Sequence, residues 1–392
     1  MKRMLGLALA LAMVFSLAGC GKAFDEGKIK EGVCYEATGI SPDAVAMKVD
    51  GASVPMDMYF YNICYAASYM QNFMTMYGMD FDWDMDLGDG MTVYDAVKQS
   101  ALENTKGFAV IEKLAKENNV VLDEDALKAL DTKLQQVIDD LGGEENYAAE
   151  LAKIGLREET YDRMRRSDSL YDALKTLYAT EGSSLYASDD TLLAYAEEQG
   201  YMTADHILLL TKDMSTYQEL DAETAAQKKE LADEIKAKLD AYTGDDIVAY
   251  FTELADEYSE DSGRESNPDG YTFGSGQMVE EFENTAAALG ENEISEVVKS
   301  SYGYHIILRK PLDAEKAVDM VRDAYFEDMM NQATENAEVT INPAVEALDV
   351  KDVYEGFLAA QEATEPDADA QDVPNSATAG ATDDVQDEQT QG

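Results

Sequence analysis

The chain contains no proline from Met56 to Asn267, although 7 prolines occur elsewhere among its 392 residues. Proline interrupts helices because it lacks an amide hydrogen and its ring collides with the preceding turn. Long helices are therefore permitted throughout this segment. The Met- and Tyr-rich stretch 56–81 is expected to form one of them. Core packing is the simplest role for most of its apolar side chains, although flexible Met side chains also adapt to varied apolar partners.

Amphipathic spacing locates further helices in the first half of the chain. The clearest is expected over 123–141, where apolar residues recur three and four positions apart. Asp123 is suited to cap its start, and Gly142-Gly143 to end it. Other helices are expected over 146–179 and 189–200. Before them, the alternating sequence AVAMKVDGASV predicts a short strand or hairpin that turns at its Asp-Gly pair.

The first twenty residues, MKRMLGLALALAMVFSLAGC, combine a basic start, an apolar run and small residues before Cys20. This is the layout of a secretory signal, and its apolar run is shorter than a usual membrane-spanning helix. The last four residues resemble the bacterial lipobox, in which the cysteine is lipidated and the chain is cut before it. We therefore expect a signal peptide over 1–19, a lipid on Cys20 and a tether over 20–44. An uncleaved signal anchor is the alternative.

The charge of the chain excludes one class of partner. With 80 acidic and 30 basic residues, the formal net charge is −50, which repels nucleic acids, so no nucleic-acid partner is expected. Only two histidines and no Cys-x-x-Cys spacing are present, so no metal site and no cofactor are expected. Cys34 and Cys64 either form a disulfide or remain thiols. Residues 359–392 are expected to be a disordered tail, because from residue 361 onward they lack Lys, Arg and aromatic residues.

The two histidines occur in matching contexts, ADHILLL at 204–210 and GYHIILR at 303–309, and each opens an apolar run. The first run predicts a strand, and the second belongs to a pair of strands expected over 297–310, around a Tyr-Gly turn. Between them, helices are expected over 222–242, 245–259 and 278–290. The order strand, two helices, loop, helix and two strands predicts a small mixed sheet with helices against it. His206 and His305 are then on strands of one domain.

Five pieces of this region resemble, in order and spacing, a parvulin-type peptidyl-prolyl isomerase. They are ADHILL (204–209), the long helix that follows it, FTELADEYSED (251–261), FGSGQMVEEFENTAAAL (273–289) and ISEVVKSSYGYHIILR (294–309). The flanking regions resemble the chaperone part of PrsA- and SurA-type extracytoplasmic foldases. There the likeness rests on VDGASVPMDMYFY (49–61), on LAKIGLREETY (151–161) and on a helical stretch after the isomerase domain.

The resemblance implies that both histidines lie side by side in the sheet beneath the active site and share hydrogen bonds. Asp261 takes the position near the substrate carbonyl, and Ser300 supplies a hydroxyl to the same network. Taken alone, a histidine on an apolar strand is usually a buried core residue. The two interpretations are compatible, because a buried histidine can also orient a site.

The resemblance further implies a slot for the proline ring. Met278 and Phe282 are four residues apart and are expected on one helical face, with Phe273 as a third wall and Tyr302 in an adjoining turn. Rotation about an amide makes and breaks no σ-bond, so such an enzyme needs neither a nucleophile nor a metal. It needs a site that favours the twisted amide over either planar form.

Two departures from the parvulin pattern are visible. The sequence NPDGYTF (267–273) replaces a Gly-Gly-Asp-Leu-Gly turn, and Gly270 stands where an apolar pocket wall is usual. In addition, Lys212 is the only basic residue in the stretch after the first strand (208–221), so selection for phosphoserine-proline is not expected.

These expectations combine into an α+β protein. A helical chaperone module is expected from 45–199 and from a C-terminal helix over 312–358, with the parvulin domain, 200–311, inserted between them. The expected function is that of a foldase on the extracytoplasmic face of a bacterial cell membrane. It would isomerise X-Pro bonds in exported proteins and bind them while they are unfolded. The alternative is a holdase chaperone that keeps the parvulin fold without catalysis.

Overall fold

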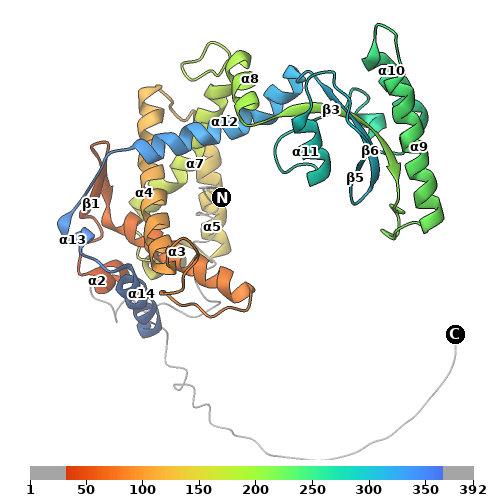
Figure 1. Cartoon of the computed structure of the whole chain (residues 1–392). Coiled ribbons are helices and arrows are strands. Elements are labelled where there is room, and N and C mark those ends of the chain that lie inside the picture. Colours follow the sequence, from red (N-terminus) through yellow and green to blue (C-terminus); the bar gives the residue numbers. More distant parts are fainter. Residues whose placement is uncertain (1–31, 365–392) are drawn as a thin grey trace, which may run out of the picture. The chain divides into compact units, whose positions relative to one another are not determined.

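The computed structural model describes residues 32–364 (Figure 1). The expected signal peptide, Cys20 and residues 365–392 of the expected tail lie outside the described residues. The described chain divides into two compact units, and each is considered by itself. Unit 1 comprises 107–126 and 167–337, and unit 2 comprises 32–106, 127–166 and 338–364.

Unit 2 consists mainly of helices. Its own elements are α2 (Val33–Thr38), β1 (Val45–Val49), β2 (Ala52–Pro55), α3 (Met56–Met76), α6 (Glu144–Lys153), β7 (Val339–Ile341), α13 (Pro343–Glu346) and α14 (Val350–Thr364). Three further helices contribute residues to both units: α4 (Val93–Glu117), α5 (Glu124–Asp140) and α7 (Glu158–Ala179). The helix expected over 123–141 is thus confirmed, and Asp123 caps it by accepting a hydrogen bond from the amide of Ala126. The expected stretch 146–179 forms two helices, α6 and α7.

A three-stranded sheet in unit 2 joins the two ends of the described chain. The expected hairpin is confirmed: β1 pairs with β2, and Asp50 and Gly51 have φ angles of 47° and 82°, as a two-residue hairpin turn requires. β7 pairs with the other edge of β1, which gives the order β2-β1-β7. The sequence did not predict β7, because three residues are too few to show an alternating pattern.

Helix α3 forms the core of unit 2. All of its residues from 56 to 68 are buried, which confirms core packing as the role of most of this Met- and Tyr-rich stretch. Helix α14 packs on α3, with the rings of Phe60 and Phe357 5.9 Å apart in an edge-to-face arrangement. The hydroxyls of Ser68 and Tyr354 are 3.1 Å apart.

Helix α2 lies within the segment that the sequence predicts as a tether. Val33 and Cys34 are buried there, because α2 packs against α14 and α3. The structured part of the chain therefore begins earlier than residue 45. Cys34 and Cys64 are both buried free thiols, so the two do not form a disulfide with each other.

An ion pair connects the start of α3 to the loop before α7. The carboxylate of Asp57 is fully buried and accepts hydrogen bonds from the Nε and the main-chain amide of Arg157, at 2.9 and 3.1 Å. It also accepts one from the amide of Met58. A buried carboxylate is costly unless it is paired and hydrogen-bonded, and these contacts offset its desolvation. The pair joins the two flanking stretches, 49–61 and 151–161, that resemble PrsA- and SurA-type proteins.

Unit 1 contains a four-stranded sheet with the order β4-β3-β6-β5. The elements in this part are β3 (Met202–Leu210), α9 (Ala222–Asp240), α10 (Ile247–Tyr258), β4 (Tyr271–Phe273), α11 (Glu280–Ala288), β5 (Val298–Lys299) and β6 (Gly303–Lys310). All pairs of strands are antiparallel, which corrects the expectation of a mixed sheet. Strand β4 was not expected, because it is only three residues long and lies in a polar loop.

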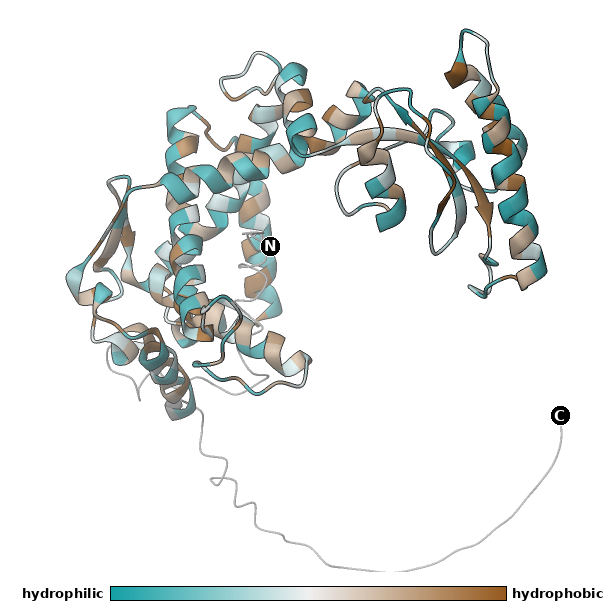
Figure 2. Ribbon diagram, viewed as in Figure 1, coloured by the Kyte–Doolittle hydropathy of each residue, from teal (hydrophilic) through white to brown (hydrophobic). Residues whose placement is uncertain are grey.

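The two faces of this sheet are covered by different helices (Figure 1). Successive residues of a strand point to opposite faces. Ile207 and Leu209 of β3 and Ile306 of β6 belong to the core formed with α9 and α10. Ala204 and Ile307 belong to the core formed with α11. The strands are correspondingly among the most hydrophobic segments of unit 1, as Figure 2 shows.

The remaining helices of unit 1 enclose an aromatic cluster. Helix α12 (Ala314–Asn336) packs on α8 (Asp189–Glu198), which confirms the helix expected near 189–200. Phe326 lies 5.2 and 5.4 Å from the ring centroids of Tyr171 and Tyr178 on α7. Tyr195 of α8 meets the ring of Tyr325 at 4.9 Å. The segment 312–358 contains α12, β7, α13 and most of α14, which corrects the expectation of one C-terminal helix. Helix α14 continues to Thr364, so residues 359–364 are helical, which corrects the expected start of the disordered tail at 359.

We expect residues 338–364 to be essential for the stability of unit 2, because they supply β7 and the α14 side chains that pack on α3. Deleting a buried Phe side chain alone costs about 3–5 kcal/mol. A chain ending at residue 337 is expected to lose most of the resistance of unit 2 to urea. Fluorescence of Trp83, the chain's only tryptophan, reports this directly, since Trp83 contacts Tyr354. A chain ending at residue 364 is the matched control. Equal urea midpoints for both truncations would contradict this account.

Candidate active site

His206 and His305 are on adjacent strands of the sheet in unit 1. In the β3–β6 ladder His206 is opposite Ile307, and Leu208 is opposite His305, so the two rings are diagonal neighbours on one face. Aromatic side chains reach each other across such a diagonal. The two Nδ1 atoms are 3.2 Å apart, and both side chains are buried.

This contact continues in both directions as a chain of hydrogen bonds. On one side, Nε2 of His206 is 3.0 Å from Oδ2 of Asp261, which lies in the loop after α10. On the other side, Nε2 of His305 is 2.7 Å from the hydroxyl oxygen of Ser300, in the turn between β5 and β6. The amide of Tyr302 donates to that hydroxyl. The structure thus brings Asp261, His206, His305 and Ser300 into one relay of polar groups.

The protonation states of Asp261 and His305 constrain the hydrogen positions in this relay. Burial would raise the pKa of Asp261, but hydrogen bonds from His206, Tyr271 and the amide of Gly263 outweigh it and hold the pKa well below the usual range. The carboxylate can therefore only accept hydrogen bonds. Burial, together with the neighbouring His206, lowers the pKa of His305 to about 3, so this ring is neutral at pH 7.

For two neutral rings, a single arrangement of protons satisfies every contact. His206 donates from Nε2 to Asp261, so its Nδ1 is an acceptor. His305 then donates from Nδ1 to His206, and its Nε2 accepts from the Ser300 hydroxyl. A proton added to His206 would reverse the last two bonds, because each neutral imidazole has one donor and one acceptor nitrogen.

The residues expected to form the proline slot lie in one cluster on the same face. Phe273 and Phe282 have ring centroids 5.6 Å apart, and Phe282 is 5.2 Å from the ring of His206. Both phenylalanines are nearly fully buried, at 1% and 3% exposed. Met278 packs on this cluster and is only partly buried. Helix α11 begins at Glu280, so Met278 precedes it, which corrects the expectation that Met278 and Phe282 share a helical face.

Tyr302 is connected to the relay through its main chain only. Its amide donates to Ser300, whereas its side chain is exposed in the turn before β6. The expected lipidation site, Cys20, lies outside the described residues. Among the described residues no cluster of three or more metal-binding side chains occurs, and no helix is long and apolar enough to cross a membrane.

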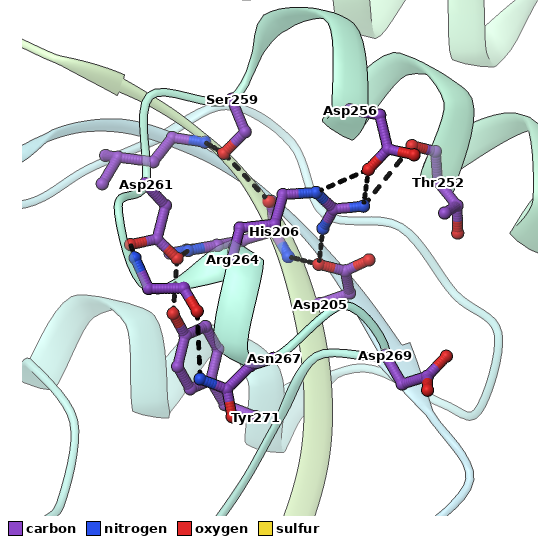
Figure 3. A network of polar contacts seen from close by, with 12 residues as sticks. Asp205, His206, Thr252, Asp256, Ser259, Asp261, Arg264, Asn267, Asp269 and Tyr271 are labelled. Atoms are coloured by element: carbon purple, nitrogen blue, oxygen red, sulfur yellow. Dashed lines mark hydrogen bonds and ion pairs between the residues drawn. The ribbon is translucent and has the colours of Figure 1, made fainter.

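The sequence did not single out Tyr271, the first residue of β4. Its hydroxyl donates to Oδ2 of Asp261 over 2.6 Å, and its ring meets His206 edge-on (Figure 3). The sequence feature that could have indicated it is an aromatic residue directly after Gly270, in the loop that departs from the parvulin pattern. Gly270 has a φ of 90°, and a Cβ there would be 2.7 Å from the carbonyl oxygen of Ala204. The glycine is thus required by close contact with β3, and the aromatic side chain beside it faces the site.

A second ion pair holds the loop that carries Asp261. The guanidinium of Arg264 is 2.7 Å from Oδ1 of Asp205 and 2.8 Å from Oδ1 of Asp256 on α10 (Figure 3). Asp205 directly precedes His206, and its Oδ1 also accepts the amide of His206. Burial raises the pKa of Asp205, and the charge of Arg264 opposes that rise. The loop is therefore tied both to β3 and to α10 beside the relay.

Comparison with known proteins identifies the family of this region. Residues 206–310 match the Rotamase family, the PPIC-type PPIASE domain. The match over residues 206–310 identifies a peptidyl-prolyl cis-trans isomerase of the parvulin type. The similarity also extends beyond this domain.

The chain is 32% identical over 279 residues to "Foldase protein PrsA 2" of Listeria monocytogenes serotype 4b, covering 68% of this chain and 83% of that one. It is 29% identical over 263 residues to "Foldase protein PrsA 3" of Bacillus cereus, covering 65% and 79%. The chain belongs to the PrsA foldase family. A crystal structure of a Bacillus cereus peptidylprolyl isomerase (PrsA) aligns with a TM-score of 0.28 at 20% identity, covering 82% of this chain and 99% of that one.

The lowered pKa of His305 predicts a dependence of stability on pH. An unfolded chain binds a proton at this ring below pH 6.5, whereas the folded unit does so only near pH 3. Between these values protonation favours unfolding, so this ring lowers the free energy of unfolding by about 1.4 kcal/mol for each unit that the pH falls. Because the carboxylates also titrate, the measurement compares the wild type with His305→Gln in urea titrations followed by circular dichroism. The free energy of unfolding of the variant should decline less steeply as the pH falls. Equal slopes for the variant and the wild type would contradict the lowered pKa of His305.

Proposed function

We propose that this isomerase acts on X-Pro bonds of exported proteins, with Asp261, His206, His305 and Ser300 shaping its active site. The observation that carries this proposal is the relay of hydrogen bonds beneath the apolar cluster. We assign Phe273 and Phe282 to the floor of a proline slot and Met278 to its open side, with Tyr302 in the adjoining turn.

The chemistry required of such a site is limited. Rotation about an amide has a barrier of about 18–20 kcal/mol because conjugation is lost at the twisted geometry. An enzyme lowers this barrier by binding the twisted form more tightly than either planar isomer. The planar amide places partial negative charge on its carbonyl oxygen. The ionised carboxylate of Asp261, placed near that oxygen, disfavours the planar form and has a smaller effect on the less conjugated twisted form.

The slot is tested by variants that differ in burial. Met278→Ala removes a partly exposed side chain and is expected to reduce kcat/KM for an X-Pro peptide about tenfold, which is about 1.4 kcal/mol of transition-state stabilisation. Phe282→Leu keeps the apolar volume in part and should cause a smaller loss. Met320→Ala, at an exposed position on α12, is the control and should have no effect. Full activity in Met278→Ala would refute its assignment to the slot.

We further propose that the protein is held on the extracytoplasmic face of a bacterial membrane by lipid on Cys20. The support is the basic, apolar and small-residue order of residues 1–20 and the similarity to the lipobox. Several acyl chains would suffice for stable anchoring, at about 0.8 kcal/mol per buried CH₂. In bacteria, Cys20→Ser is expected to abolish incorporation of labelled fatty acid and to move the protein out of the membrane fraction. Unchanged labelling would refute the anchor.

Binding of unfolded clients is supported by an exposed apolar surface at the end of α3. Phe73, Met76, Tyr77 and Met79 are all exposed there, Met76 to 72% and Tyr77 to 64%. Five aspartates follow within ten residues: Asp80, Asp82, Asp84, Asp86 and Asp89. No Lys or Arg occurs from residue 49 to residue 97. Apolar side chains followed by a run of aspartates favour unfolded segments that are both apolar and basic.

The surface is tested by replacing its two most exposed side chains. The double variant Met76→Ser, Tyr77→Ser is expected to lose much of the ability to suppress aggregation of an unfolded basic client, while X-Pro isomerisation is unchanged. Val121→Ser removes an apolar side chain that is 83% exposed elsewhere and is the matched control. Wild-type suppression by the double variant would exclude this surface as the client site.

A further inference from the structure

We propose that Tyr271 is a positioning residue for the isomerase reaction, which fixes the Asp261 carboxylate and, through it, the ring of His206. The inference rests on the proposed roles of Asp261 and His206 and adds a residue to which neither the parvulin resemblance nor the sequence pattern assigns a part. It begins from the place of Tyr271 in the sheet.

Strand β4 places the Tyr271 side chain next to His206. In the β3–β4 ladder Tyr271 is opposite Ala204, two residues before His206 on the same strand face. The ring centroids of Tyr271 and His206 are 5.8 Å apart with an interplanar angle of 78°, an edge-to-face contact. Tyr271 also packs on the cluster that contains Phe273 and Phe282. The ring therefore supplies apolar surface beside the proposed slot. It lies next to Gly270, which has no side chain to supply such a surface.

The loop before β4 leaves space for the hydroxyl. Gly263 lies two residues after Asp261, and a Cβ at this glycine would be 2.2 Å from the Tyr271 hydroxyl oxygen. Any larger residue there would displace the hydroxyl or the loop. Gly263 has φ −79°, which every L-residue adopts readily, so the backbone conformation does not require glycine. What requires it is the tyrosine hydroxyl.

The hydroxyl completes the set of donors around Asp261. Oδ2 accepts from both Nε2 of His206, at 3.0 Å, and the Tyr271 hydroxyl, at 2.6 Å. Oδ1 accepts from the amide of Gly263 at 3.0 Å. The carboxylate cannot rotate without losing a charge-assisted hydrogen bond, which is stronger than a hydrogen bond between neutral groups. Without Tyr271, the orientation of Asp261 would depend on His206 and one amide alone.

The chemistry of Tyr271 suits a permanent donor. Burial and the adjacent carboxylate of Asp261 raise the pKa of this phenol above its usual range. The hydroxyl therefore remains protonated at neutral pH. The ring and the hydroxyl have separable effects, because the ring borders the slot and the hydroxyl contacts only Asp261 among the site residues.

The test is a double-mutant cycle in the full chain, read as kcat and KM for an X-Pro peptide. Tyr271→Phe keeps the ring and removes the donor, so kcat is expected to fall about fivefold to tenfold while KM stays within about twofold. In an Asp261→Ala background the same change is expected to alter kcat by less than about twofold. Tyr258→Phe removes a hydroxyl that accepts a hydrogen bond from Lys238 and is the matched control. It should leave kcat and KM unchanged.

A second cycle keeps the inference testable if Tyr271→Phe alters stability. Gly263→Ala should reduce kcat by a similar factor, since its Cβ collides with the hydroxyl. In the Tyr271→Phe background, Gly263→Ala should cause no further loss. Wild-type kcat for Tyr271→Phe, or equal losses with and without Asp261, would overturn the role of Tyr271 alone. Full activity of Asp261→Ala would overturn the proposed role of Asp261 together with this inference.

Discussion

The contact between the two histidine rings is the interaction on which the rest of the site depends. It requires β3 and β6 to pair in a register that sets His206 and His305 diagonally on one face, because a shift by one residue would turn one ring to the other face. It also requires the rings to be buried with every nitrogen satisfied, since an unpaired buried polar group costs several kcal/mol. Asp261 and Ser300 meet this condition at the two ends of the relay. One requirement, that both buried rings meet with every nitrogen hydrogen-bonded, thus fixes the register of the sheet, the loop after α10 and the turn before β6.

Two local features of this chain complete that arrangement. Arg264 ties the Asp261 loop to Asp205 and Asp256, so the loop is held from the sheet and from α10. Gly270 allows β4 to approach β3 closely and thereby sets Tyr271 against His206. The loop that departs from the parvulin pattern thus places an aromatic ring beside His206.

The sequence predicted much of this arrangement and missed specific parts for physical reasons. The relay residues can be predicted from the sequence for two reasons. The two histidines open matching apolar runs, and the surrounding pieces resemble parvulins in order and spacing. Strands β4 and β7 cannot be predicted from the local pattern because each has only three residues. They form because they pair with strands that are distant in the sequence. The spacing of Met278 and Phe282, four residues apart, predicts one helical face, whereas α11 begins two residues after Met278. The Asp57–Arg157 pair joins residues 100 positions apart, a contact that no spacing rule reveals.

The hydrogen positions of the relay are the most direct consequence of this account, and the chain suits their measurement because it has only two histidines. In full-length protein labelled with ¹⁵N at histidine, the ring nitrogens distinguish protonated from unprotonated sites at pH 7. The account predicts that His206 carries its proton on Nε2, facing Asp261, and that His305 carries its proton on Nδ1, facing His206. A His305 protonated on Nε2, or a His206 whose Nε2 lacks a proton, would contradict it.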